Sequence, residues 1–212
     1  MYMRRTVAAL AVAAIVAGPA AAADLDAYSY GNQSYAAPLA PAAAIDWTGI
    51  YIGAQLGYGW TGAGRANADG FLAGGTIGGN WQTGSLVLGA EVDAAYSGMG
   101  YSGVFDRFDL NWIGTARARL GLAFDRFMVF GTGGFGWSTG EYQLFGAGTA
   151  SNTHTGWAAG LGAEMALTSN ISARVDYLHL DLSDKFYPVG PAAGQTIGPN
   201  LNLLRAGVNY RF

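Results

Sequence analysis

The two histidines are the residues best suited to acid–base or nucleophilic chemistry, because the chain contains no cysteine. A lipid deacylase would need a histidine and a serine within hydrogen-bond reach, typically near a strand end. His154 is followed by Thr155, and His179 by Leu180 and Asp181, so neither histidine forms a His-x-Ser pair on one face of a strand. The sequence therefore predicts that the protein is not an enzyme. An amphipathic ring at an interface is the simpler interpretation of His179.

Other kinds of reactive or binding site are also poorly supported. Two histidines on separate segments, with scattered aspartates, do not form a set of metal ligands. Pairs of glycines occur at 74–75, 78–79 and 133–134, but no helix follows them, so they are not phosphate-binding loops. The net charge of −3 argues against a nucleic-acid partner. We expect no cofactor, no metal and no nucleic acid.

A small set of charged residues lies at alternate positions of apolar segments, where they share one face with Gly, Ser, Thr and Asn. Acids and arginines are nearly balanced on this face. Arginine suits an enclosed space because its planar guanidinium pairs with a carboxylate through two hydrogen bonds. We predict that four acids and five arginines form a charge network in a narrow lumen: Glu91, Asp93, Glu164 and Asp176 with Arg117, Arg119, Arg174, Arg205 and Arg211.

The composition points away from an ordinary soluble domain. Of 212 residues, 51% are hydrophobic and only 12% are charged, whereas a soluble domain usually has about 25% charged residues. Lys185 is the single lysine. The aromatic content of 13% argues against a disordered chain, because so many rings need burial.

The N-terminus has the pattern of a secretory signal peptide. Arg4 and Arg5 precede an apolar stretch of about 11 residues, and Gly18-Pro19 and four alanines follow. This stretch is shorter than the roughly 20 residues of a membrane-spanning helix, although an N-terminal anchor is the alternative. We predict a cleaved signal peptide over 1–23, a flexible periplasmic lead-in over 24–45 and a single domain over 46–212.

From residue 46 onward apolar and polar residues alternate with a period of two, which is typical of β-strands. No later stretch has 18 consecutive apolar residues, so a membrane-embedded form would have to be a closed barrel. Short turns alternate with long loops at 61–69, 97–108, 139–153 and 183–200, as in transmembrane barrels. The pattern predicts an all-β fold, an eight-stranded antiparallel up-and-down transmembrane β-barrel, with strands near 47–60, 70–82, 85–96, 109–121, 126–138, 154–167, 170–182 and 201–212.

A lipocalin-like soluble barrel also alternates, with its apolar face inward. Its polar face would need many charged residues to meet water, and here that face has few. The aromatic residues of the apolar face also gather near the strand ends, as in the two aromatic girdles of membrane barrels. In strand 126–138 we expect Phe127, Val129, Phe135 and Trp137 to point outward. The predicted girdle residues are Tyr58, Trp60, Phe71, Tyr96, Trp112, Trp137 and Trp157 at the outer rim, and Trp81, Phe127, Tyr210 and Phe212 at the periplasmic rim.

Several motifs resemble those of a known family. They are Asp46-Trp47-Thr48-Gly49-Ile50-Tyr51-Ile52-Gly53, Gly79-Asn80-Trp81-Gln82, Leu88-Gly89-Ala90-Glu91-Val92-Asp93 and the C-terminal segment from Leu204 to Phe212. The chain resembles the small, porin-like outer-membrane β-barrel proteins of alphaproteobacteria, relatives of the OmpA membrane domain and of the opacity proteins. The resemblance implies that Tyr210 and Phe212 mark the chain for the barrel-assembly machinery. Because OmpA itself continues into a peptidoglycan-binding domain that has no counterpart here, we do not expect tethering to peptidoglycan.

Three functions remain open at this point. The first is a structural outer-membrane protein that supports the envelope and displays surface loops, which is the function we expect. The second is a small pore for ions or polar solutes, and the third is recognition of a ligand or host surface by loops 97–108 (Tyr101, Phe105, Arg107, Phe108) and 183–200 (Lys185, Phe186, Tyr187, Pro188). We expect location in the outer membrane of a Gram-negative cell with both termini periplasmic. The expected partners are outer-membrane lipid, lipopolysaccharide, periplasmic chaperones and the barrel-assembly machinery, and the sequence does not indicate an oligomer.

Overall fold

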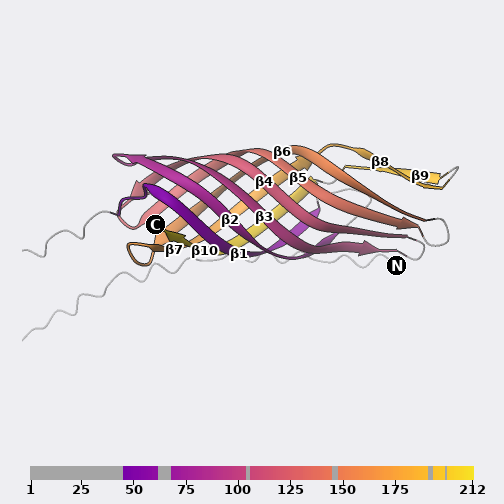
Figure 1. The fold of residues 1–212 in the computed structure, drawn as a ribbon, viewed down its shortest axis with the longest axis horizontal. Helices are drawn as coiled ribbons and strands as arrows, with labels where there is room; N and C mark the ends of the chain where they lie inside the picture. The colour runs from indigo at the N-terminus through magenta and orange to yellow at the C-terminus, as the bar shows by residue number, and fades with distance from the viewer. Residues whose placement is uncertain (1–44, 62–67, 104–105, 145–147, 191–192, 199) are drawn as a thin grey trace, which may run out of the picture. The chain divides into compact units, whose positions relative to one another are not determined.

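A computed structural model describes residues 45–61, 68–103, 106–144, 148–190, 193–198 and 200–212. Within this part of the chain, eight strands form a closed barrel in the order β1-β10-β7-β6-β5-β4-β3-β2 (Figure 1). The predicted eight-stranded antiparallel barrel is therefore confirmed. The predicted signal peptide and the lead-in up to residue 44 lie outside the described residues. The barrel strands are β1 (Gly49–Thr61), β2 (Asp69–Thr83), β3 (Leu86–Ser102), β4 (Asp106–Phe124), β5 (Phe127–Leu144), β6 (Gly148–Ala166), β7 (Ile171–Leu182) and β10 (Asn200–Arg211).

The barrel closes where its first strand meets its last. β1 pairs antiparallel with β10 from Tyr51↔Arg211 to Thr61↔Leu201, so these two strands have neighbours on both sides. A closed barrel satisfies the backbone hydrogen bonds of its strands without an open edge, which a bilayer requires. No helix among the described residues is long and apolar enough to cross a membrane.

One end of the barrel carries the short connections, and we call it the turn end. Two-residue turns at 84–85 and 125–126 and the connection 167–170 lie here, together with the C-terminus (Figure 1). Gly84 has φ 60° and Asp125 has φ 50°. Both values lie in the left-handed region that two-residue hairpins favour, and Gly and Asp tolerate it better than other residues. Short turns were predicted at 83–84 and 122–125; the structure confirms a short turn at each place and shifts them to 84–85 and 125–126.

The opposite end, which we call the loop end, is built differently from the prediction. β3 and β4 continue to Ser102 and from Asp106, and β5 and β6 continue to Leu144 and from Gly148. The predicted loops 97–108 and 139–153 are therefore mostly strand, which corrects their boundaries. Polar and small residues in these segments resemble a loop in sequence, but pairing of adjacent strands satisfies their backbone groups.

A bulge in β4 explains one error of side-chain facing. The alternation around Trp112 predicts that Leu110 points outward, yet Leu110 is fully buried. The register between β4 and β5 shifts between Leu110 and Trp112. The residues of β4 that precede Trp112 therefore face the opposite side from the one that the alternation predicts. An extra residue in one strand has this effect, because side chains alternate with a period of two.

The predicted loop 183–200 also contains structure. β8 (Lys185–Gly190) and β9 (Ala193–Ile197) pair antiparallel as a separate hairpin at the loop end (Figure 1). The Asn152 side-chain amide in β6 donates a hydrogen bond of 3.0 Å to the Phe186 carbonyl oxygen. The part of β6 that extends beyond β7, before Gly156, therefore contacts the hairpin.

Every strand of the barrel carries large, exposed apolar side chains on the outer wall. Exposed side chains of this wall include Leu56, Phe71, Leu161 and Phe212. In β5 the outward residues Phe127, Val129 and Phe135 are about half exposed, as predicted. This surface would aggregate in water, and it suits a hydrocarbon environment.

Candidate functional site in the barrel lumen

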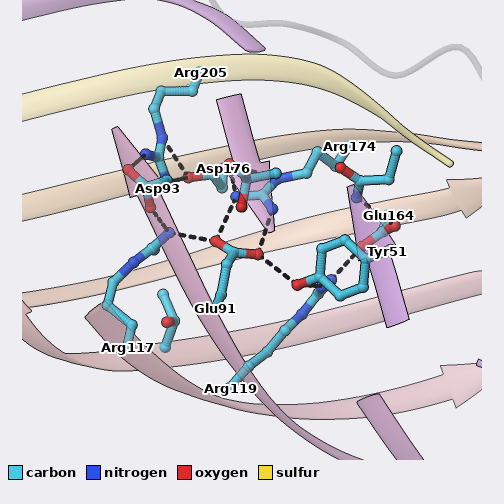
Figure 2. A network of polar contacts seen from close by, with 12 residues as sticks. Tyr51, Glu91, Asp93, Arg117, Arg119, Glu164, Arg174, Asp176 and Arg205 are labelled. Atoms are coloured by element: carbon cyan, nitrogen blue, oxygen red, sulfur yellow. Dashed lines mark hydrogen bonds and ion pairs between the residues drawn. The ribbon is translucent and has the colours of Figure 1, made fainter. Parts of the chain in front are cut away.

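Eight charged side chains from five strands meet inside the barrel. Glu91 and Asp93 come from β3, and their partners come from β4, β6, β7 and β10. Each of the eight residues is at most 4% exposed. They reach the interior because each lies at an inward position of the strand alternation. The eight residues are Glu91, Asp93, Arg117, Arg119, Glu164, Arg174, Asp176 and Arg205 (Figure 2).

Glu91 lies at the centre of this network. Arg174 donates to both of its carboxylate oxygens, at 2.5 Å from Nη1 and 3.1 Å from Nη2. Arg117 donates to Oε1, and the Tyr51 hydroxyl donates to Oε2 at 2.7 Å. One carboxylate thus joins β1, β3, β4 and β7 across the lumen (Figure 2).

Asp93 and Asp176 form a second part of the network with three arginines. Arg205 lies between the two carboxylates, at 3.0 Å from Asp93 and 2.6 Å from Asp176. Arg117 also bonds Asp93 at 2.6 Å, and Arg174 bonds Asp176 at 3.0 Å. The last barrel strand, β10, is thereby tied to β3 across the interior as well as to its neighbour β7.

Glu164 forms the part of the network that involves the fewest charges. Arg119 donates to its Oε2, and Ser172 and Asn209 donate to its Oε1. The Arg119 guanidinium also stacks 3.8 Å from the centre of the Phe130 ring. Arg119 is the one arginine bonded to Glu164 among the described ion pairs. Arg119 Nη1 also donates to the Tyr51 hydroxyl at 3.3 Å, so this pair is joined to the rest of the network through Tyr51.

Arg211 does not join this network, which corrects the prediction. Its guanidinium donates to the Ser169 carbonyl oxygen at 2.6 Å and lies 5.3 Å from the centre of the Trp47 ring. Arg211 is the last residue of β10, so its inward side chain reaches the mouth of the barrel and not its middle. The four acids therefore face four arginines, and the network is neutral.

An apolar cluster closes the lumen at the turn end. Trp47 is fully buried and packs with Val87, Ala123, Met128 and Ala166. The segment before β1 is held in place by hydrogen bonds from the Trp47 amide to Gln82 Oε1 at 2.8 Å and from the Gln82 amide to Thr48 Oγ1 at 3.1 Å. Trp47 therefore acts as a plug below the charge network.

A larger apolar cluster fills the lumen at the loop end. Its residues are inward-facing side chains of β2, β3, β4, β5, β6, β7 and β10, and all are at most 5% exposed. Sequence analysis did not predict this cluster. The alternation of β7 could have revealed it, since 178, 180 and 182 continue the inward positions of Arg174 and Asp176. The cluster contains Leu72, Ala95, Met99, Phe108, Leu110, Ile113, Tyr142, Ala158, Leu178, Leu180, Leu182, Leu201 and Leu203.

The lumen thus consists of three layers: an apolar plug, a neutral charge network and an apolar cluster. Buried charges need full pairing because the desolvation cost of an ion can exceed the attraction it gains. Each carboxylate in the network meets that condition with at least two hydrogen-bond donors. An eight-stranded barrel is just wide enough for its side chains to fill it, and the layers do so here.

Comparison with known proteins identifies the family. Residues 8–212 match the family described as outer membrane protein beta-barrel domain. The chain belongs to this family. The family predicted from the sequence motifs is therefore confirmed. The chain is an outer-membrane β-barrel protein.

Individual relatives agree with this assignment. The 31 kDa outer-membrane immunogenic protein of Brucella melitensis is 31% identical over 243 residues, covering 98% of this chain and 100% of the relative. The 22 kDa outer membrane protein of Rhizobium leguminosarum is 31% identical over 188 residues, covering 83% and 82%. The crystal structure of Neisserial surface protein A shares the fold with a TM-score of 0.55. It is 17% identical and covers 78% of this chain and 98% of its own.

The outer-membrane barrel carries its predicted girdle residues on the outer wall. Tyr58, Trp60, Phe71, Tyr96, Trp112 and Trp157 lie toward the loop end and are exposed, and Trp137 is half-buried because its indole lies over Gly114. Trp81, Phe127, Tyr210 and Phe212 are exposed toward the turn end. Tyr210 and Phe212, the predicted assembly residues, contact each other edge to face at 5.2 Å.

The two histidines occupy different environments. His154 is buried at the loop end of β6, where it precedes the girdle residue Trp157 by three residues. Its Nδ1 lies 3.0 Å from the Ser183 carbonyl oxygen. Burial lowers the pKa of His154, although the Ser183 carbonyl partly opposes this effect. His179 lies on the outer wall, with Nδ1 at 2.9 Å from Asn202 Oδ1. Neither histidine has a serine hydroxyl among its described hydrogen-bond partners.

The predicted recognition loop 97–108 exposes Arg107 but buries Phe108. Phe108 is 1% exposed and belongs to the loop-end cluster, and Arg107 is paired with Asp109 at 2.6 Å. Phe105 lies outside the described residues. In the segment 183–200, Phe186 is 60% exposed and Lys185 is also exposed.

Proposed function

We propose that this outer-membrane barrel is a structural protein of the envelope with a sealed lumen, and that it is neither an enzyme nor an open pore. The observation that carries the proposal is the three-layer filling of the lumen. An ion crossing the barrel would have to displace Trp47, the network around Glu91 and the loop-end leucines. Removing one partner of a buried ion pair costs about 3–5 kcal/mol, which disfavours spontaneous opening.

Planar-bilayer recording tests the proposal against the pore. The full chain after removal of its signal segment is refolded, and boiled and unboiled gel samples first show that the barrel has closed. We expect a closed barrel without discrete current steps. Steady and reproducible steps from the closed barrel would favour a porin-like pore for ions or small polar solutes and would overturn the sealed structural role.

The proposed orientation places the loop end outside the cell and both barrel termini in the periplasm. Short turns on the periplasmic side and longer strands and connections outside are the usual arrangement. The name of the Brucella relative, an immunogenic outer-membrane protein, supports an exposed surface of this kind.

The absence of cysteine from the chain makes this orientation simple to test. Ser151→Cys at the loop end and Ser169→Cys at the turn end each supply one exposed thiol. We expect a membrane-impermeant maleimide to label Ser151→Cys on whole cells, and Ser169→Cys only after the outer membrane is opened. The reverse pattern would overturn the orientation.

The proposal includes recognition of the C-terminal residues by the barrel-assembly machinery, after delivery by periplasmic chaperones. Support comes from the exposed, adjacent rings of Tyr210 and Phe212 at the end of the last strand. We expect Phe212→Ser to lower the amount of chain assembled in the outer membrane. Phe124→Ser is a matched control, because Phe124 is also exposed at the turn end but is remote from the C-terminus in sequence. Equal losses for both variants would contradict a specific role of Phe212.

A further inference from the structure

The outer wall carries a hollow that the sealed-lumen function does not use. Its volume is about 770 Å³, within the range of about 300–1,000 Å³ that is typical of small-ligand sites. The lining side chains that are most exposed are outward-facing ones, including Leu120, Val129, Leu161 and Leu204. The hollow therefore opens toward the membrane and not into the lumen.

A glycine forms the floor of this hollow. Gly131 of β5 lies directly between Leu120 of β4 and Leu161 of β6 in the strand register. A Cβ atom at Gly131 would meet no atom closer than the Gly160 carbonyl oxygen at 4.0 Å. The space between the two leucines is therefore left open by the missing side chain, and a larger residue at position 131 would fill it.

The hollow occupies the part of the wall next to the turn end. On β4 and β5 its lining residues lie within four residues of the strand ends at Phe124 and Phe127. It extends up to the paired residues Tyr177 and Leu204, and Tyr177 lies six residues above the start of β7. At about 3.3 Å per residue and a strand tilt of about 40°, six residues rise about 15 Å. This height matches the thickness of one hydrocarbon leaflet, about 15 Å.

The position of the hollow determines which lipid surrounds it. In the proposed orientation the turn end is periplasmic, so the hollow faces the periplasmic leaflet of the outer membrane. Phospholipids form that leaflet, whereas lipopolysaccharide surrounds the loop end on the outside of the cell. The molecule available to fill the hollow is therefore a phospholipid, with an acyl chain that runs from the periplasmic boundary to the middle of the bilayer.

An arginine lies at the periplasmic end of the hollow. Along the β4–β5 hairpin the lining pair Leu122↔Val129 is followed by the exposed pair Phe124↔Phe127 and then by the turn that contains Arg126. The two phenylalanine rings place this turn at the boundary between hydrocarbon and water. Arg126 is exposed. Within the part of the chain that the structure describes, every other arginine bonds an acid or a backbone carbonyl, and the side chain of Arg126 bonds neither.

Backbone hydrogen bonds on both sides hold this turn in place. The Ala166 amide of β6 donates to the Arg126 carbonyl oxygen at 2.8 Å, and the Ala123 amide of β4 donates to the Ser85 carbonyl oxygen at 2.7 Å. The position of the arginine backbone is therefore fixed relative to the hollow. A guanidinium group suits a phosphate, because its planar N–H donors can bond two phosphate oxygens at once.

We infer that this wall binds one phospholipid of the periplasmic leaflet, with an acyl chain in the hollow over Gly131 and its phosphate on Arg126. The occupant follows from charge as well as position, because a neutral lipid would give Arg126 no anion to bind. The choice of leaflet rests on the proposed orientation of the barrel. Binding itself does not depend on whether the lumen conducts.

Native mass spectrometry of the full chain in detergent micelles tests this inference. The probes are phosphatidylethanolamine and diacylglycerol with identical acyl chains, together with lipid A. We expect one phosphatidylethanolamine molecule to be retained at detergent concentrations that remove diacylglycerol. Equal retention of these two lipids would overturn the phosphate site, and preferential retention of lipid A would overturn the choice of occupant. A micelle has no leaflets, so this result is independent of the orientation, which the maleimide labelling tests separately.

Three variants test the phosphate contact. Arg126→Gln should lower retention of phosphatidylethanolamine about tenfold, equivalent to about 1.4 kcal/mol, and leave retention of diacylglycerol unchanged. Asp125→Asn removes the exposed carboxylate next to Arg126 and should raise retention of phosphatidylethanolamine alone, because like charges repel. Arg107→Gln is the matched control, since Arg107 is an exposed arginine that is already paired with Asp109. Equal losses of both lipids in Arg126→Gln would overturn the phosphate contact.

A second set of variants tests the hollow. Gly131→Leu fills the floor, and we expect retention of phosphatidylethanolamine and of diacylglycerol to fall together. Gly75→Leu is the matched control, since Gly75 faces outward on β2 outside the lining of the hollow, with room for a Cβ 3.4 Å from the nearest atom. Equal losses in these two variants would contradict a specific role of the hollow.

Folding of each variant is checked by the mobility of boiled and unboiled samples. If Gly131→Leu does not close, Gly131→Ala is measured instead, because its Cβ has open space. Unchanged lipid retention in both Gly131 variants would overturn the inference. So would a dimer of the wild-type chain that disappears on filling the hollow, because the occupant would then be a second copy.

Discussion

The middle and the two ends of the lumen are all buried, but they are held by different physical interactions. The middle layer contains eight charged side chains whose ion pairs join strands far apart around the barrel. The ends contain rings and aliphatic side chains around Trp47 and around Leu178 and Leu180. The middle is therefore sensitive to the geometry and sign of each charge, whereas the ends are sensitive mainly to volume.

Reversing one charge in the middle layer should give the largest effect. Arg119→Glu places two carboxylates together in a buried site, and we expect a loss of about 5 kcal/mol in the free energy of unfolding. Urea unfolding of the barrel in lipid vesicles, followed by Trp fluorescence, measures it. Adding Glu164→Arg should restore a large part of the loss, because Arg119 is the one arginine bonded to Glu164 among the described ion pairs.

The same exchange between Arg117 and Glu91 is the contrasting case. Glu91 also bonds Arg174, so Arg117→Glu with Glu91→Arg would place the new arginine beside an existing one. We expect little recovery in this double variant. Full recovery in it, or no recovery in the Arg119–Glu164 exchange, would contradict the described arrangement of the middle layer.

Truncating the turn-end plug should have the next largest effect. Trp47→Ala removes a fully buried ring, and comparable core truncations cost about 3–5 kcal/mol. We expect a loss of about 4 kcal/mol in the free energy of unfolding by the same urea assay. Trp81→Ala removes an exposed ring and should cost less than half as much. Equal losses would mean that Trp47 does not fill the mouth of the barrel.

A truncation in the loop-end cluster should cost somewhat less. Leu180→Ala is expected to lower the free energy of unfolding by about 3 kcal/mol, because part of the cavity can relax near the barrel rim. The outward Leu161→Ala, in contrast, should change it little in vesicles, since lipid replaces the lost contacts. If Leu161→Ala were the more costly of the two, the loop-end cluster would not contribute as a packed core.

Lowering the pH should have the smallest effect, and this effect should be confined to the loop end around His154. Burial lowers the pKa of His154, so the unfolded chain binds a proton more readily than the folded chain. The contribution of His154 to the free energy of unfolding is therefore fully present above the ordinary pKa of histidine, and it declines as the pH falls below that value. We expect faster hydrogen exchange in the loop-end part of β6 at pH 5.5 than at pH 7.5, after correction for intrinsic rates.

His154→Gln removes the titrating group and is expected to abolish that pH difference. Exchange in the middle of β3, where Glu91 lies, serves as the internal reference. A pH response that persists in His154→Gln would assign it to another group at the loop end.

Most of the architecture could be predicted from the sequence. The period-two pattern set the number of strands and the face of nearly every side chain, because a strand directs alternate residues to opposite sides. The same pattern placed Glu91, Arg117 and Arg174 in the lumen and Trp60 and Trp112 on the wall. A signal of this kind is local, so it can be read without knowledge of the fold.

Tertiary structure decided what depends on pairing between distant segments. The bulge beside Leu110 reversed the facing of β4, and strand pairing extended β3 to β6 through segments that resemble loops. Which acid bonds which arginine, and why Arg211 bonds none of them, followed from the height of each residue in the closed barrel. The sequence by itself determined the strands, the inward or outward direction of their side chains, and the family. The register between paired strands determined the three layers of the lumen, because strand pairing brings together residues of distant segments that alternation along one strand does not connect.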